Sequence, residues 1–387
     1  SIVTLNAITD YANLISDFHE SVGGWSIINL FTLITRSLLS NEICNQNELI
    51  FKSNKILIDS FKESKQIAFM DLSFETSIYS GQVSDSRLEF LGKFPWSDGF
   101  SNHLAKCWTS LVISMLGKDI RLIIVDLDNT LWGGVIGEDG VEGVKIGGDF
   151  PGNAFKAFQI ELLNQSKRGV AIAVASKNNE NIALKAISNL PEMVIRKNNI
   201  QAYEINWDPK WKNIIKICEK LNLGLESVLF IDDNPIEREL VKRNLPDVKI
   251  LPLTNDPSDY SFILKSFPYL RPINSSKEDL GRLNDFTTQK KRDKLKSRSA
   301  NLDDYFASLN ISLRLNLLND GNSQRAAQLC QKTNQFNTTT RRYDQKQLYE
   351  LKSSGADIFV INYEDRYSPT ENLGLIILKY KDENIVI

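Results

Sequence analysis

Residues 122–131 constrain the fold most, because a short apolar run there ends in two carboxylates separated by one residue. The run Leu-Ile-Ile-Val is followed by Asp126, Leu127 and Asp128. Such a run is typical of a buried strand in a parallel sheet. Open α/β sheets bind ligands at the carboxyl ends of their strands, so both acids are expected at such an edge. The alternative is a strand that ends in a turn, with the acids as caps.

Three later segments repeat the pattern of an apolar strand followed by polar residues. Residues 170–175 precede Ser176-Lys177-Asn178, residues 203–206 precede Lys210, and residues 228–231 precede Asp232-Asp233. Amphipathic helices are expected between them, over about 153–168, over 211–221 and from Pro235. This alternation predicts an α/β fold with a doubly wound parallel sheet. Right-handed crossovers would bring the four strand ends to one edge.

The carboxylates at this edge suit phosphoryl transfer. One of the pair Asp126 and Asp128 would attack phosphorus and the other would shuttle a proton. Asp232 and Asp233 would add the oxygen ligands that Mg²⁺ prefers. A role as caps explains one of these two acids, but not both.

The remaining polar residues at the strand ends are candidates for phosphate binding. Ser176 can donate a hydrogen bond to a phosphoryl oxygen, while Lys177 and the amides around Asn178 add positive potential. The alternative for Ser176 is an N-cap of the next helix. Lys210 can hold a nucleophilic carboxylate and a phosphate together as a point charge.

The spacing of these segments leaves no room for a separate cap domain. Ser176 follows Asp126 by 50 residues and Lys210 follows Ser176 by 34, and helix and strand fill most of both intervals. A domain needs roughly 50 residues. The glycine-rich run over residues 133–140 predicts only a short hairpin flap. We therefore expect an open site with a minimal cap, which favours a macromolecular or carrier-borne substrate.

Composition excludes several classes of function. With 46 basic and 48 acidic residues, the chain does not resemble a protein dedicated to nucleic acid or to a membrane surface. Residues 25–39 are too short an apolar stretch to span a bilayer, and we expect no signal peptide. The four cysteines lie far apart without a CxxC pair, which favours a reduced, cytoplasmic protein. His19 and His103 are expected to be packing or surface residues, without a second metal ligand nearby.

Taken together, Asp126-Leu-Asp-Asn-Thr, Ser176, Lys210 and Asp232-Asp233 resemble the four motifs of the haloacid dehalogenase superfamily. The resemblance implies that Asp126 is the nucleophile and Asp128 the general acid and then the base. It implies that Mg²⁺ is held by the Asp126 carboxylate, the Asp128 backbone carbonyl and the last acidic pair. Asp233 is favoured as the direct ligand with Asp232 in support, although the order could be reversed.

Further motifs resemble one narrower group, the FkbH-like proteins. They are Asp-Leu-Asp-Asn-Thr-Leu-Trp-Gly-Gly-Val-Ile-Gly-Glu-Asp-Gly (126–140), Ile-Asn-Trp (205–207) and the segment 332–343. The resemblance implies a partial, degenerate SGNH-hydrolase-like domain over 1–118 and a phosphotransferase domain over 119–260. A helical linker over 261–300 and a truncated acetyltransferase-like α+β domain over 301–387 would follow.

Such proteins dephosphorylate D-1,3-bisphosphoglycerate and transfer a glyceryl or lactyl unit to the phosphopantetheine thiol of an acyl carrier protein, for polyketide-type biosynthesis. One alternative is a phosphatase in surface-polysaccharide synthesis, without a thioester. Another is a carrier-docking scaffold without activity. The chain departs from the family at residues 365–371, where a glycine-rich turn is usual, and it ends before a segment that normally carries a cysteine. Cys330 is the nearest candidate for a thioester step, against the alternative of a buried structural cysteine.

Overall fold

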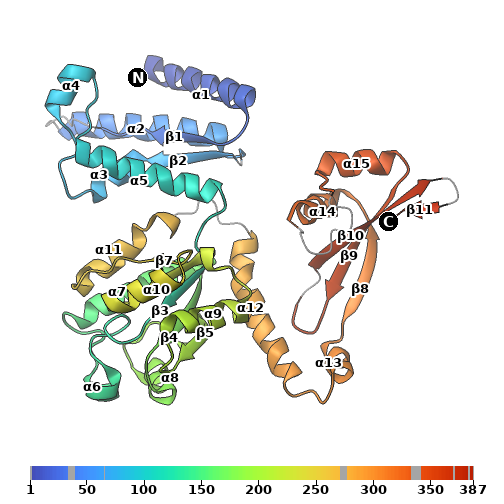
Figure 1. The fold of residues 1–387 in the computed structure, drawn as a ribbon. Helices are drawn as coiled ribbons and strands as arrows, with labels where there is room; N and C mark the ends of the chain where they lie inside the picture. Colours follow the sequence, from blue (N-terminus) through green and yellow to red (C-terminus); the bar gives the residue numbers. More distant parts are fainter. Residues whose placement is uncertain are drawn as a thin grey trace. The chain divides into compact units, whose positions relative to one another are not determined.

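The computed structural model describes residues 2–33, 40–64, 66–270, 277–332, 341–368, 371–381 and 384–386. The chain divides into two compact units, Ser1–Leu283 and Asn284–Ile387, which are drawn in Figure 1. We describe each unit by itself. Within the described residues, no helix is long and apolar enough to cross a membrane.

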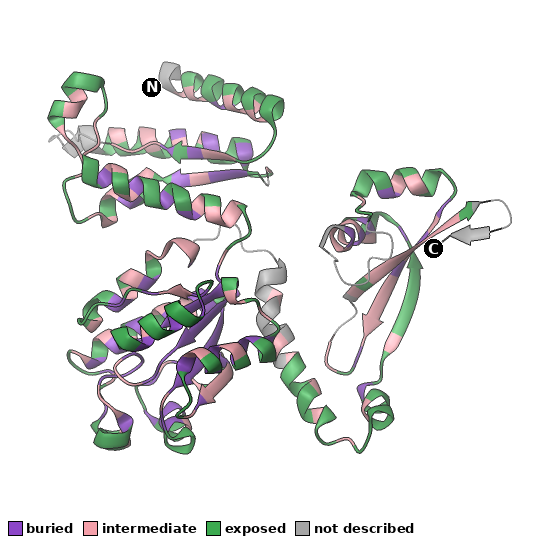
Figure 2. Cartoon of the chain, in the orientation of Figure 1, coloured by how far each residue is buried: buried purple, intermediate pink, exposed green. Residues whose placement is uncertain are grey.

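A five-stranded parallel sheet forms the centre of the first unit. Its strands are β3 (Leu122–Val125), β4 (Ala171–Ser176), β5 (Ile200–Ile205), β6 (Val228–Ile231) and β7 (Lys249–Ile250), in the spatial order β5-β4-β3-β6-β7. Every residue of β3, β4 and β6 is buried, as Figure 2 shows. A strand buried on both faces explains why these runs are apolar throughout instead of alternating. The α/β fold with a central parallel sheet is therefore confirmed.

The strand order indicates where a ligand is expected to bind at the carboxyl edge of the sheet. The chain proceeds from β3 outward through β4 to β5, then returns to the other side of β3 and proceeds through β6 to β7. Right-handed crossovers then put the helices of the two halves on opposite faces. The direction changes between β3 and β6, which makes that crevice the expected ligand site of an open α/β sheet.

Helices surround this sheet. They are α6 (Ile136–Gly143), α7 (Gly152–Lys167), α8 (Glu180–Asn189), α9 (Lys210–Leu221), α10 (Pro235–Asn244) and α11 (Tyr260–Lys265). Among them, α7, α9 and α10 lie close to their predicted positions. Leu264 and Leu270 are buried in the core that contains β3, so this core continues past residue 260.

Two local expectations are wrong. The flap is not a simple hairpin: Gly133 and Lys145 pair as an antiparallel bridge, but α6 lies between them. Ser176 does not cap the following helix, because the Asn179 side chain accepts the hydrogen bond from the Ile182 amide at the start of α8. Ser176 therefore remains available for a different role.

The N-terminal part of the first unit is also α/β. It contains α1 (Ile2–Val22), β1 (Ser26–Leu30), α2 (Ser40–Phe61), β2 (Ile67–Asp71), α3 (Leu72–Ile78), α4 (Ser86–Gly92) and α5 (Asp98–Met115). Strands β1 and β2 pair in parallel, and Ile28 and Leu57 are buried in a core of their own. The predicted likeness of this region to an SGNH hydrolase stays a prediction.

The second unit is an α+β arrangement. Its elements are α12 (Lys277–Lys296, which begins in the first unit), α13 (Leu302–Leu309), β8 (Ser312–Leu317), α14 (Asp320–Lys332), α15 (Gln345–Ser353), β9 (Asp357–Glu364), β10 (Glu371–Lys381) and β11 (Asn384–Val386). The strands form an antiparallel sheet in the order β11-β10-β9-β8. Within and after the predicted helical linker, α12 and α13 are separate helices, because α12 ends at Lys296 and Asn301 caps a new helix by accepting from the Asp304 amide. The likeness to an acetyltransferase stays a prediction.

Candidate active site

The crevice between β3 and β6 brings two of the predicted acids side by side. Val125 and Ile231 are partners in the sheet register, so Asp126 and Asp232 follow at the same level. The Asp126 amide donates a 2.9 Å hydrogen bond to the Ile231 carbonyl, which extends the pairing by one residue. Carboxylate oxygens of Asp126, Asp232 and Asp233 all lie within 4.8 Å of one another. The structure thus places three acids at the ends of two neighbouring strands.

Lys210 supplies the cation of this cluster. Its ammonium Nζ lies 2.6 Å from Asp232 Oδ2 and 3.0 Å from Asp126 Oδ1, and the side chain is only 4% exposed. Lys210 is the first residue of α9, which follows β5. Burial alone would lower the lysine pKa, but the two carboxylates outweigh it and raise the pKa. Lys210 is therefore a permanent positive charge between the two acids.

Three carboxylates against one ammonium leave the cluster short of positive charge. Burial, with repulsion from Asp126, raises the pKa of Asp232 to about 7 and also raises that of Asp233. Asp126 Oδ1 is buried beside the Lys210 ammonium at 3.0 Å, but Asp232 shares the same ammonium. Buried carboxylates are costly unless enough cations or hydrogen-bond donors pair with them. Oxygen-only donors and excess negative charge fit a hard divalent cation such as Mg²⁺.

Asp128 is held differently from the other acids. Its Oδ1 accepts hydrogen bonds from the Trp132 indole at 2.9 Å and from the Ile136 amide at 3.1 Å, and its Oδ2 accepts from the Asn178 amide at 2.8 Å. Burial raises the pKa of this carboxyl despite these donors. A fixed carboxyl group with a raised pKa is suited to hold and release a proton near neutral pH.

Three residues that support the acids were not predicted from the sequence. The Thr130 hydroxyl lies 3.4 Å from Asp233 Oδ1 and accepts from the Asp233 amide at 3.2 Å. The Arg238 guanidinium donates to the backbone carbonyls of Asp232 and Asp233 at 2.7 and 3.0 Å. The Trp132 indole holds Asp128. Thr130 and Trp132 were visible within the 126–140 motif, whereas no signal pointed to Arg238.

The candidate phosphate-binding residues have different surroundings. Ser176 is the last residue of β4 and is 1% exposed, and its carbonyl accepts from the Asn206 amide at 3.1 Å. Asn178 contacts Asp128, as described above. Lys177 instead places its ammonium 2.7 Å from Glu237 Oε1 on α10. The positive charge of Lys177, which was expected to attract phosphate, is therefore paired with a carboxylate.

Cys330 is buried on α14, and burial raises the pKa of its thiol. A thiolate is therefore disfavoured there, as expected for a structural cysteine. The same unit contains an open surface pocket of about 480 Å³ whose lining includes Arg341, Arg342 and Lys379 together with the carboxylate of Glu350.

Neither a scan against models of protein families nor a search of curated proteins found a match. Among solved structures, the chain is similar to the N-terminal part of a Bacteroides fragilis protein, which contains a phosphatase domain and is complexed with Mg. The two are 28% identical with a TM-score of 0.65, over 71% of this chain and 74% of that one. This likeness and the strand order show that the central sheet has the haloacid-dehalogenase-type fold. They also support a phosphatase activity.

Two other structures match over less of this chain. One is a candidate 3-deoxy-D-manno-octulosonate 8-phosphate phosphatase from Vibrio cholerae, at 16% identity and a TM-score of 0.26, covering 42% of this chain and 89% of that one. The other is a hypothetical protein from Xanthomonas campestris, at 15% identity and a TM-score of 0.23, covering 47% and 90%. TM-scores this low do not establish a shared fold over the aligned residues.

Proposed function

We propose that this protein is a Mg²⁺-dependent phosphatase or phosphotransferase that uses Asp126 as its nucleophile. The observation that carries the proposal is the cluster of three carboxylates, Asp126, Asp232 and Asp233, that share the ammonium of Lys210 at the end of the sheet. The Mg²⁺ complex of the Bacteroides fragilis phosphatase domain supports the choice of metal. A structural role for the cluster would not require excess negative charge at the ligand edge of the sheet.

In the proposed reaction, a carboxylate oxygen of Asp126 attacks phosphorus, and the bond from phosphorus to the leaving oxygen breaks. Asp128 gives its proton to that oxygen and afterwards takes a proton from the water that hydrolyses the aspartyl-phosphate. Lys210 holds the Asp126 carboxylate in place and offsets the charge of the phosphoryl oxygens. Ser176, at the end of β4, would donate a hydrogen bond to one of them.

A bound Mg²⁺ would be held by Asp126, the Asp128 carbonyl and Asp233, and it would neutralise charge shared by nucleophile and substrate. Asp233 is the better direct ligand because both oxygens of Asp232 are engaged. Asp232 Oδ2 contacts Lys210, and its Oδ1 accepts from the Asn234 amide at 2.9 Å. Asp233 Oδ1 has only a long contact of 3.4 Å with the Thr130 hydroxyl.

The test of this chemistry is phosphate release by the full chain with and without Mg²⁺, first with a generic aryl phosphate. We expect release only with Mg²⁺, and an aspartyl-phosphate on Asp126 that is identified by hydride reduction and peptide mass spectrometry. Label on any other residue, or release that is unchanged by a chelator, would contradict the mechanism.

At a finer level, we propose D-1,3-bisphosphoglycerate as the substrate and the phosphopantetheine thiol of an acyl carrier protein as the acceptor of the glyceryl or lactyl unit. The motifs at 126–140 and 332–343 support this specificity. The open pocket lined by Arg341, Arg342, Lys379 and Glu350 carries a net positive charge, which is compatible with the phosphate of phosphopantetheine.

Intact mass spectrometry tests the acceptor. The chain would be incubated with Mg²⁺, 1,3-bisphosphoglycerate and a holo acyl carrier protein, with the apo carrier as the control. A glyceryl adduct on the holo carrier alone is the expected result. Phosphate release without an adduct would leave a phosphatase of another pathway, such as surface-polysaccharide synthesis.

A further inference from the structure

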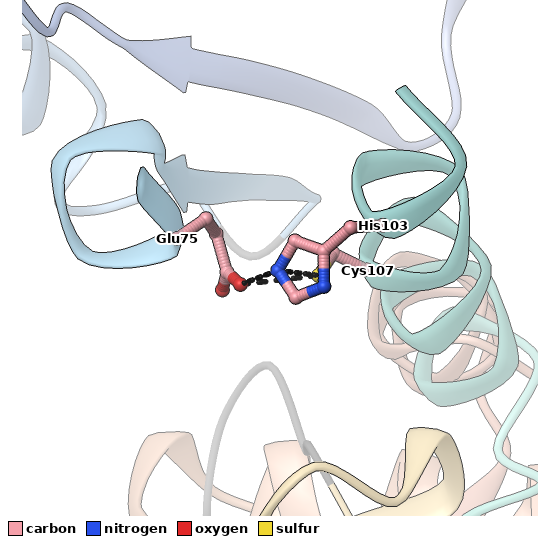
Figure 3. Close-up of side chains that lie close together, drawn as sticks. All are labelled: Glu75, His103 and Cys107. Atoms are coloured by element: carbon pink, nitrogen blue, oxygen red, sulfur yellow. Dashed lines mark hydrogen bonds and ion pairs between the residues drawn. The ribbon is translucent and has the colours of Figure 1, made fainter. Parts of the chain in front are cut away.

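A second group of metal-ligand side chains lies in the N-terminal part of the first unit. Figure 3 shows Glu75 on α3 facing His103 and Cys107 on α5. His103 and Cys107 are four residues apart, so they project from the same face of the helix one turn apart. The expectation that His103 has no second ligand nearby is therefore wrong.

The donor atoms of these three side chains converge on one point. His103 Nε2 lies 2.8 Å from Glu75 Oε2, Cys107 Sγ lies 3.2 Å from the same oxygen, and Sγ and Nε2 are 3.7 Å apart. A Cys-His-Glu catalytic triad would use both ring nitrogens, one toward the thiol and the other toward the acid. Here the single nitrogen Nε2 faces both partners. This arrangement places three potential metal-ligand atoms around one point.

The surroundings fix the three side chains before any ligand binds. Glu75 and Cys107 are each 5% exposed. The His103 ring stacks on Phe100 with centroids 5.9 Å apart and lies 5.4 Å from the Tyr79 ring. A buried carboxylate is costly unless it is paired or coordinates a metal. The His103 side chain keeps 22% of its surface exposed, which provides access from solvent.

The geometry points to a site for Zn²⁺ or a similar divalent transition metal, with Glu75, His103 and Cys107 as ligands. Carboxylate, imidazole and thiolate are the donors that zinc prefers. Tetrahedral zinc with ordinary bond lengths puts sulfur and nitrogen about 3.6 Å apart, close to the 3.7 Å found. The two contacts of Glu75 Oε2, at 2.8 and 3.2 Å, are hydrogen bonds and would lengthen by a few tenths of an ångström when the ion enters. Three protein ligands leave the fourth position to water.

Binding would exchange protons for the ion. The Cys107 thiol loses its proton to solvent as the metal–sulfur bond forms. The proton shared by His103 Nε2 and Glu75 Oε2 moves to His103 Nδ1 or to solvent, so that both atoms can bind the metal. The two negative ligands then balance the divalent charge. The bound ion would fasten α3 to α5 and stabilise this region against unfolding.

The absorption spectrum of bound Co²⁺ distinguishes this site from the proposed Mg²⁺ site. Asp126, Asp232 and Asp233 offer oxygen alone, whereas a thiolate bound to Co²⁺ gives an intense charge-transfer absorption in the near ultraviolet. The experiment therefore titrates the full, chelator-treated chain with Co²⁺. We expect that absorption to saturate at one equivalent, and to disappear when one equivalent of Zn²⁺ is added. No charge-transfer absorption on the unaltered protein would overturn the proposal, without recourse to any variant.

Variants then assign the ligands. Cys107→Ser should abolish the absorption, whereas Cys218→Ser, at an equally buried cysteine, should leave it unchanged. His103→Gln, at a partly exposed position, should weaken Co²⁺ affinity by at least about tenfold. Zn²⁺ should raise the unfolding midpoint of the unaltered chain and not that of Cys107→Ser. Absorption that survives Cys107→Ser would contradict the assignment.

Discussion

Two buried carboxylate sites differ in how completely their negative charge is satisfied: a cluster of three acids in the first unit and the single carboxylate of Asp365, with its donors, in the second. In the first unit, Asp126, Asp232 and Asp233 share the single ammonium of Lys210. In the second unit, Asp365 alone accepts from the Arg292 guanidinium at 2.8 Å and from the Tyr363 hydroxyl at 2.6 Å, and also from two backbone amides.

The pKa values move in opposite directions for this reason. Burial without enough donors raises the pKa of Asp232, whereas the donors to Asp365 outweigh its burial and hold its pKa far below the ordinary value. A cluster that satisfies its own charge stabilises the fold, in this case the 365–368 turn. A cluster whose charge is not satisfied requires a further cation, and this requirement makes the Asp126 cluster the candidate functional site.

The largest expected effect is that of Asp126→Asn. The substitution removes the nucleophile but keeps the side-chain shape, so phosphate release should fall by about 10⁴-fold or more while the fold persists. Rates and circular dichroism would be compared with those of Asp208→Asn, which alters an exposed carboxylate paired with Lys216. A normal rate in Asp126→Asn would refute the mechanism.

Asp128→Asn should have the next largest effect, a loss of about 10³-fold. The amide oxygen can still accept from Trp132 and Ile136, so the flap should keep its position. Without a base for water, hydrolysis of the phospho-enzyme should slow more than its formation. Rapid-quench kinetics would then show a burst of leaving group, and a uniform decrease of both steps would argue against a role as base.

The metal-free protein should lose stability as pH rises. Because the Asp232 pKa is raised from 3.8 to about 7, the stabilisation from its protonated form is complete below pH 4 and is lost as pH passes 7. The full difference is about 4 kcal/mol, of which about 3 kcal/mol falls between pH 5 and pH 8. Urea unfolding at these two pH values would measure that part. Mg²⁺ should stabilise more at pH 8, where protons no longer compete. Asp232→Asn should remove the part of the pH dependence that Asp232 causes and leave the part from Asp233, whose pKa is also raised.

Local patterns were sufficient to predict the central sheet and most of its site. Apolar runs, helix-start signals and the rule of right-handed crossovers together placed Asp126, Asp232 and Lys210 at one edge, and the structure brings them into contact. These predictions succeeded because each residue directly follows a buried strand or begins a helix. The backbone then fixes its position within narrow limits.

Contacts between distant segments could not be predicted in this way. The partner of Lys177 is Glu237, 60 residues later, and an exposed lysine can turn toward many neighbours. Glu75 precedes His103 by 28 residues and comes from a different helix. The spacing of His103 and Cys107 was visible in the sequence, but two ligands alone do not indicate a metal site. The third side chain, Glu75, is brought close by the packing of α3 against α5.

Asp365→Asn tests how much the paired charge of Asp365 contributes to the stability of the second unit. The amide oxygen can still accept from the Tyr367 and Ser368 amides, but the charge that holds Arg292 is lost, so the second unit should be destabilised by about 3 kcal/mol. Phosphate release should be unchanged. The lowered pKa of Asp365 means that its stabilisation is present above about pH 4 and is lost as pH falls below that value, opposite to Asp232.

Urea unfolding of the second unit at pH 7 and at pH 3 checks this prediction. The variant should lose the part of the acid sensitivity that Asp365 causes. Asp357→Asn is the matched control, because Asp357 accepts from the Tyr380 hydroxyl at an exposed position of the same sheet and should cost less than about 1 kcal/mol. Equal destabilisation by the two substitutions would show that satisfied charge is not what distinguishes the Asp365 cluster.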